Sequence, residues 1–111
     1  MAYTINGEAV EIAGPEDVGG VPFVPLASVT EMLGGYATWD NSSKTASIEL
    51  GATKVDVQED NDTVTTEDGS ITLSSRPSMA RGSLWVPLEL FSTVLGCSVT
   101  NEGDDISISG P

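Results

Sequence analysis

The chain has 111 residues, of which 39% are hydrophobic and 19% charged, a composition typical of one globular domain. Seventeen acidic residues against four basic ones give a formal net charge of −13, which disfavours binding to nucleic acid and to anionic membrane surfaces. No stretch approaches the roughly 20 apolar residues of a membrane-spanning helix, and residues 1–4 lack the basic and apolar regions of an export signal.

The first predicted element is a β-hairpin. Asn6 and Gly7 lie between the strand-like runs 3–5 and 9–12, and Asn-Gly readily supplies the two residues with positive φ that a type I′ turn requires. The polar run 13–20 that follows is predicted to be a loop.

A change from strand to helix is predicted at Pro25. Residues 21–24 form an extended run, and proline suits the first position of a helix, which makes Val24 the expected N-cap although it has no side-chain acceptor. Apolar residues then recur at helical spacing, and Gly34 fits the left-handed position after the helix. The apolar stripe consists of Leu26, Val29 and Leu33, with Met32 beside it.

A second hairpin follows the first helix. Residues 36–39 and 45–48 are predicted strands, and residues 40–43 form the turn between them. An alternating run, 54–57, and an acidic turn, 58–62, lead into the second half of the chain.

The second half repeats this order at a shift of 62 residues. The shift aligns the turn Asn6-Gly7 with Asp68-Gly69, Phe23-Val24-Pro25-Leu26 with Trp85-Val86-Pro87-Leu88, and Leu33-Gly34 with Leu95-Gly96. It therefore predicts strands at 64–66, 71–73 and 83–86, a polar loop at 74–82, and a helix with the stripe Leu88, Phe91 and Leu95, flanked by Val94. A closing hairpin is predicted over 97–108, with its turn at 101–104.

These elements predict an α+β fold in which antiparallel β-hairpins pack on two short helices, duplicated about an internal pseudo-twofold axis. Each helix spans about nine residues, or ~13 Å, and helices this short require packing on a sheet. A unit of about 55 residues is near the lower limit for independent stability. We therefore expect one domain, 1–111, made of two repeats at about 1–58 and 59–111, in which Phe23 and Trp85 anchor the helix-sheet core.

Two stretches of the sequence, "FVPLASVTEMLGGYATWDNSSKTASIEL" and the more degenerate "LWVPLELFSTVLGCSVTNEGDDISIS", look like two copies of one unit. They resemble the bacterial copper amine oxidase N-terminal-like domains, also called stalk domains. The resemblance covers residues 3–109 and implies a small antiparallel sheet packed on a helix, without catalytic activity, in a secreted or envelope-attached bacterial protein. Ala27 and Glu89 replace the arginine usual after Val-Pro-Leu, and Asn101-Glu102 replaces Trp-Asp in the second copy.

Neither a cofactor nor a metal is expected. Copper sites use imidazole and sulfur ligands, whereas this chain has no histidine, one cysteine and three scattered methionines. The acidic segments 59–62 and 102–105 keep a calcium-stabilised domain open as an alternative, although neither matches the EF-hand pattern. Cys97 lacks a histidine that could take its proton. No acidic pair stands out as glycosidase-like, so we expect no enzyme.

The candidate ligand-binding residues are Trp39, Asp40 and Tyr36. Exposed aromatic rings stack on sugars, and Trp39 begins a turn with Tyr36 three residues earlier, although alternation places these two rings on opposite faces of a straight strand. Packing of Trp39 in the core or turn is the competing interpretation.

The sequence favours a non-catalytic extracellular stalk or interaction module, with a protein or cell-wall glycan as partner. A carbohydrate- or peptidoglycan-binding module centred on Trp39 is the alternative. The sequence leaves the oligomeric state open.

Overall fold

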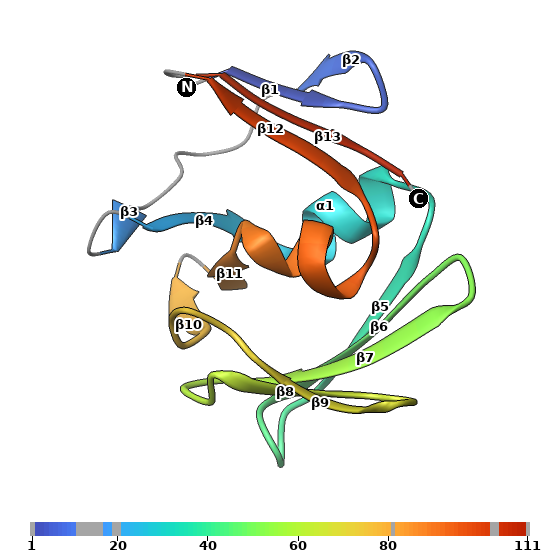
Figure 1. The fold of residues 1–111 in the computed structure, drawn as a ribbon. Helices are drawn as coiled ribbons and strands as arrows, with labels where there is room; N and C mark the ends of the chain where they lie inside the picture. Colours follow the sequence, from blue (N-terminus) through green and yellow to red (C-terminus); the bar gives the residue numbers. More distant parts are fainter. Residues whose placement is uncertain (1, 11–16, 19–20, 81, 103–104, 111) are drawn as a thin grey trace.

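A computed structural model describes residues 2–10, 17–18, 21–80, 82–102 and 105–110. In Figure 1 the two helices and strands β4 and β11 lie between a four-stranded sheet and a five-stranded sheet. The molecule is mostly β-sheet with two short helices, so the predicted α+β class is confirmed.

The first part of the chain contributes seven strands and the longer helix. They are β1 (Ala2–Ile5), β2 (Glu8–Val10), β3 (Asp17–Val18), β4 (Val21–Pro25), α1 (Leu26–Met32), β5 (Tyr36–Asp40), β6 (Thr45–Leu50) and β7 (Thr53–Gln58). The rest contributes β8 (Thr63–Thr66), β9 (Gly69–Thr72), β10 (Ser78–Ala80), β11 (Ser83–Pro87), η1 (Leu90–Val94), β12 (Ser98–Glu102) and β13 (Asp105–Ser109).

The three sheets combine strands from both parts of the chain. Their orders are β12-β13-β1-β2, β10-β11-β4-β3 and β5-β6-β7-β8-β9. Strands β1 and β13 pair in parallel, from Ala2 opposite Asp105 to Ile5 opposite Ile108, a pairing between hairpins that the sequence did not predict. Each hairpin is antiparallel, but the two hairpins of this sheet come from opposite ends of the chain and meet with their strands running in the same direction.

Strands β4 and β11 pair around two residues that are 62 positions apart. Val24 lies opposite Val86, Phe23 opposite Pro87, and Pro25 opposite Trp85. In the five-stranded sheet, by contrast, β7 lies between β6 and β8. The boundary at residues 58 and 59 therefore separates two adjacent strands of one sheet, β7 and β8.

The hydrophobic core draws buried side chains from all three sheets and both helices. Val24 and Val86 belong to this core. Phe23 and Trp85 are also buried, but they alternate with the two valines and point to the other face of β4 and β11. Their predicted burial in the core is therefore confirmed, but they lie outside the cluster to which both helices contribute.

Helix α1 begins one residue later than expected. Pro25, with φ −74° and ψ 119°, is the N-cap and the last residue of β4, and no side chain caps the helix. Strand pairing with Trp85 holds Pro25 in extended geometry. The helix ends as predicted: Gly34 adopts φ 92°, and its N–H donates to the carbonyl of Glu31.

The second helix is a five-residue π-helix, not an α-helix of about nine residues. The Leu88 N–H donates to the Pro22 carbonyl, which ties the expected first turn to β4. Farther on, the Leu95 N–H donates to the Leu90 carbonyl at 3.1 Å, the i+5 pattern of a π-helix. The wider turn buries the consecutive residues Leu90 and Phe91 together; the predicted stripe included Phe91 but not Leu90.

Of the two predicted Asn-Gly and Asp-Gly hairpin turns, one forms as predicted and the other lies one residue earlier. Asn6 and Gly7 have φ values of 50° and 83°, as the predicted type I′ turn requires. In the β8–β9 hairpin the turn residues are Glu67 and Asp68. Gly69, with φ 134°, already belongs to β9. The prediction of an Asp68-Gly69 turn is wrong by one residue, because the Thr66 hydroxyl accepts from the Asp68 N–H and holds a different turn.

The two predicted loops each contain a short strand. β3 pairs with β4, and β10 pairs with β11, so both strand-to-helix junctions are part of a hairpin. The predicted turn at 101–104 is shorter, because Asn101 and Glu102 belong to β12. Residues 11–16, 19–20, 81 and 103–104, which include parts of these predicted loops and turns, lie outside the described residues.

Candidate functional site

The structure separates the two aromatic residues of the predicted site. Both lie on β5, an edge strand, but Trp39 is opposite Ala46 on the core side and Tyr36 is opposite Glu49 on the outer side. The Tyr36 side chain is 73% exposed, and that of Trp39 is 41% exposed. The two rings therefore do not form one platform.

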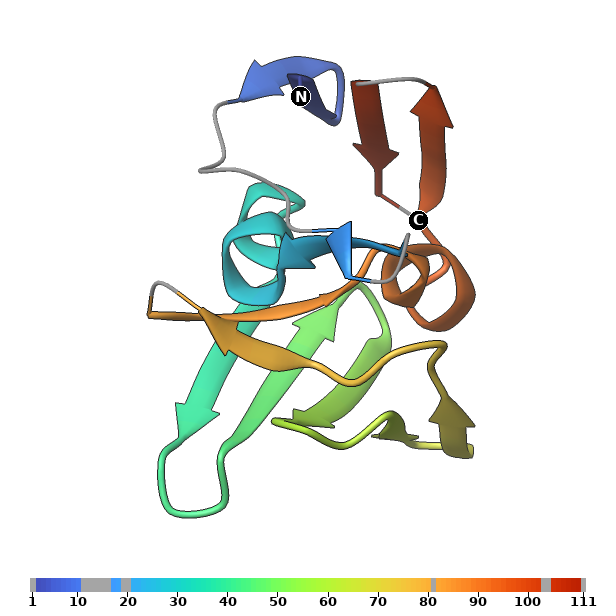
Figure 2. The ribbon, with the colours of Figure 1, turned by 90° about the vertical axis from the view of Figure 1, so that its left-hand side faces the viewer.

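Trp39 borders an open hollow of about 260 Å³ between β5 and the β10–β11 hairpin. Figure 2 shows this hairpin crossing beside β5 at one end of the five-stranded sheet. Two cross-strand pairs form opposite walls, Trp39 with Ala46 and Met79 with Leu84. The remaining lining residues are Leu26, Ala27, Ala37, Thr38, Gly82 and Ser83.

Small side chains create this hollow. Three alanines, Ala27, Ala37 and Ala46, line it where larger residues would fill the space. Met79 contributes a flexible side chain that is 41% exposed. Sequence reasoning missed Met79 because β10 was expected to be a loop, and only its pairing with β11 directs the side chain toward Leu84.

Asp40 stabilises the adjacent turn and does not line the hollow. Its carboxylate accepts from the Ser42 hydroxyl at 2.7 Å and from the Ser42 N–H at 3.0 Å. These hydrogen bonds hold the pKa of Asp40 below its ordinary value of 3.8. The carboxylate is therefore ionised at neutral pH and places a negative charge at the end of β5.

A second hollow, of about 270 Å³, lies at the corresponding place in the other half of the fold. Five of its lining residues are 62 positions away from residues of the first hollow: Val21, Pro22, Leu88, Glu89 and Val99 correspond to Ser83, Leu84, Leu26, Ala27 and Ala37. Glu89 stands where the first hollow has Ala27, and its carboxylate accepts from the Ser74 N–H. Asn101 stands where the first hollow has Trp39.

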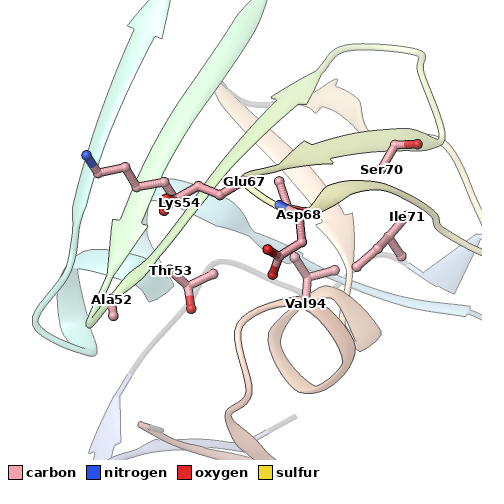
Figure 3. A pocket seen from close by; sticks show the side chains of 9 residues that line it. Ala52, Thr53, Lys54, Glu67, Asp68, Ser70, Ile71 and Val94 are labelled. Atoms are coloured by element: carbon pink, nitrogen blue, oxygen red, sulfur yellow. The ribbon is translucent and has the colours of Figure 1, made fainter.

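A third hollow, of about 370 Å³, has a mixed lining that includes Lys54, Glu67, Asp68 and Val94. Figure 3 shows Asp68 pointing toward Val94 and the Lys54 side chain extending away from it. The Lys54 ammonium instead lies 3.9 Å from the Glu49 carboxylate, and both side chains are well exposed. Such an exposed pair contributes little stability.

The comparison with known families assigns the chain. A family model described as the copper amine oxidase N-terminal domain matches residues 4–109. The chain belongs to this family. This agrees with the resemblance seen in the sequence, and the N-terminal domain of copper amine oxidases is a non-catalytic accessory domain. No curated protein matches the sequence.

The residues of this copper amine oxidase N-terminal domain do not fit a copper centre. The sequence has no histidine, and within the described ranges no three Cys, Asp or Glu residues are grouped to hold a metal ion. Cys97 is buried, and desolvation raises the pKa of its thiol, which disfavours the reactive thiolate. Among the described helices, none has the length and apolar character needed to cross a membrane.

The calcium alternative depends on the acidic turns. Residues 59–62 do form a turn, in which Asp60 has φ 61° and donates its N–H to the Pro77 carbonyl. Residues 103–104 of the other acidic segment lie outside the described residues. Calcium stabilisation therefore stays a prediction, which would be checked by a rise in melting temperature with Ca²⁺ that Mg²⁺ does not reproduce.

Proposed function

We propose that this chain is a non-catalytic interaction module of a secreted or envelope-attached bacterial protein. The observation that carries the proposal is the open hollow beside Trp39, where apolar side chains line a recess at the surface. Open apolar recesses with a few polar groups are typical binding sites. Membership of the copper amine oxidase N-terminal family supports an accessory role, and the envelope location rests on the sequence resemblance.

A binding screen would test the interaction role. The purified chain, immobilised at low density, is presented with cell-wall polymers, glycans and extracellular proteins of bacteria. The expected result is reproducible binding that weakens in Trp39→Ala and persists in Tyr36→Ala, since only Trp39 lines the hollow. Turnover of a substrate by the purified chain would refute the proposal of a non-catalytic module.

A carbohydrate- or peptidoglycan-binding module is the second candidate. It is favoured by one observation: the Trp39 ring, 41% exposed at the hollow, offers a face on which a sugar ring can stack. A glycan array would identify a ligand, and Trp39→Ala should abolish the signal. Glycan binding that survives this substitution would exclude the hollow as its site.

We also propose that the chain is one domain that arose by duplication of a half-length unit. The support is the pairing of Val24 with Val86 and the correspondence of the two hollows at a spacing of 62 residues. The two halves exchange strands, since β1 pairs with β13 and β7 with β8. Fragments 1–58 and 59–111 are therefore expected to be unfolded separately and to fold when mixed, as circular dichroism would show. Independent folding of either fragment would contradict the single domain.

A further inference from the structure

The edge of β5 beside the hollow can accept another strand. In the described part of the chain, β5 has a strand partner on one side only, β6. Its residues Tyr36–Asp40 pair with β6 over five consecutive positions without a bulge. The strand has neither proline nor lysine, the residues that commonly protect an exposed edge. Its free side therefore offers backbone donors and acceptors for pairing.

The hollow lies beside this edge. Ala37, Thr38 and Trp39, three consecutive residues of β5, line it, and Met79 and Leu84 of the β10–β11 hairpin form the opposite wall. An extended segment paired with β5 would direct alternate side chains toward the hollow and toward the outer face. One apolar side chain between Trp39 and Met79 would bury the two most exposed large apolar groups of the recess.

The outer face of the same strands favours basic side chains. Next to Tyr36 and Thr38 it carries Glu49 and Asp56 with Lys54, and Asp40 lies at the end of β5. The whole chain has a formal charge of −13. This charge opposes pairing of two copies through β5 and attracts a basic partner.

The lining of the hollow favours a peptide over a sugar. Thr38 and Ser83 are the hydroxyl side chains of its lining, and most of the other lining groups are apolar. Buried sugar hydroxyls would find few hydrogen-bond partners there, which weakens binding. An extended peptide places its own polar groups against the β5 backbone instead.

From these observations we infer that β5 accepts an extended, basic segment of a partner protein by strand addition, with one apolar side chain held between Trp39 and Met79. The inference rests on the proposed interaction role and names the class of partner for the same site. Affinity then comes from backbone pairing, and selectivity from the apolar anchor and the charge of the outward side chains.

Fluorescence anisotropy with a defined probe tests this inference. The probe is a labelled peptide of about ten residues, long enough to span the five-residue β5. It alternates lysine with threonine and carries one central leucine. Three control peptides replace the leucine by asparagine, the lysines by glutamates, or the backbone N–H groups by N-methyl groups at alternate positions.

Two methionine variants of the full chain form a matched pair. Met79 is 41% exposed and lines the hollow, whereas Met32 is 42% exposed and lies on α1 outside it. Met79→Ala should weaken binding of the leucine peptide by about fivefold or more, the effect of losing a contact at an anchor pocket. Met32→Ala should change the affinity by less than about twofold. Unchanged circular dichroism spectra would show that both variants fold.

Hydrogen exchange locates the added strand. The amides of residues 36–40 should gain protection when the leucine peptide binds, and each control peptide should bind more weakly. Binding that is equal in both methionine variants, that persists with N-methylated peptide, or that leaves β5 unprotected would overturn the inference. So would a dimer seen by light scattering with β5 protected in the absence of peptide.

A glycan outcome would separate this inference from the proposed function. If no peptide binds and soluble peptidoglycan fragments bind in a manner that requires Trp39, strand addition is refuted and the interaction module stands. If the chain turns over a substrate, the module itself is refuted, whatever the peptides do.

Discussion

Substituting Gly35 by alanine tests how tightly β5 is seated against the rest of the fold. A Cβ atom at this position would lie 2.5 Å from the carbonyl oxygen of Glu49 and 2.9 Å from Cγ2 of Thr30. The Glu49 backbone belongs to β6, which pairs with β5 on one side and β7 on the other, so it cannot move alone. We expect a loss of about 3 kcal/mol in the free energy of unfolding, at the upper end of typical overpacking effects.

The neighbouring glycine provides the control. Gly34 has φ 92°, and a Cβ there would meet nothing within 4 Å, so Gly34→Ala introduces backbone strain without a clash. Such strain costs about 1–2 kcal/mol. Urea unfolding followed by tryptophan fluorescence would give both values at an unchanged denaturant slope. If Gly35→Ala destabilises the protein no more than Gly34→Ala, the close packing of the α1–β5 connection on β6 is refuted.

Three further outcomes are expected. Cys97 is 6% exposed, so a thiol reagent should label the native protein at least about a hundredfold more slowly than the unfolded chain; rapid native labelling would contradict its burial. Folding lowers the pKa of Asp40, so the contribution of this carboxylate to stability is present at neutral pH. That contribution is lost as pH falls below 3.8 through the folded value. An NMR titration should show that Ser42→Ala moves the pKa of Asp40 part of the way back toward 3.8. Trp85→Phe removes the 2.9 Å hydrogen bond from Nε1 to the Ala80 carbonyl. It should reduce the free energy of unfolding, measured by chemical denaturation, by about 1–3 kcal/mol. An unchanged denaturation midpoint would show that this hydrogen bond contributes nothing.

Locally determined features of the fold were predictable from the sequence. Asn6-Gly7 forms the expected turn, Gly34 ends the first helix, and strands β5, β6 and β7 lie where alternation placed them. Each of these features depends on residues close together in the chain: a positive φ, a helical stripe or an alternating pattern. The position of Trp39 on the opposite strand face from Tyr36 follows from the same alternation.

Features that depend on distant partners were not predictable. β3 and β10 are two and three residues long, and they are strands only because β4 and β11 pair with them. The parallel pairing of β1 with β13 joins opposite ends of the chain. Met79 was missed as part of the candidate site for this reason, since its place in the hollow depends on pairing with Leu84.

Some local preferences were overridden by contacts of the folded chain. Proline favours the start of a helix, but Pro25 is retained in β4 by its pairing with β11. Gly69 was expected inside a turn, but the hydrogen bond to the Thr66 hydroxyl places the turn one residue earlier. Strand pairing in the first case and a side-chain hydrogen bond in the second outweighed the preference of a single residue.

The contrast between the two hollows explains why the candidate site occurs in one half of the fold. Corresponding strands and helix ends produce a recess of similar size in each half. In one recess Ala27 leaves space and Trp39 provides an apolar wall. In the other, Glu89 occupies the position of Ala27 and accepts a hydrogen bond from Ser74, which connects the helix end to the neighbouring segment. Both recesses are open and of similar volume, but they differ in lining: Glu89 makes one of them more polar and connects it to Ser74, whereas Ala27 and Trp39 leave the other apolar.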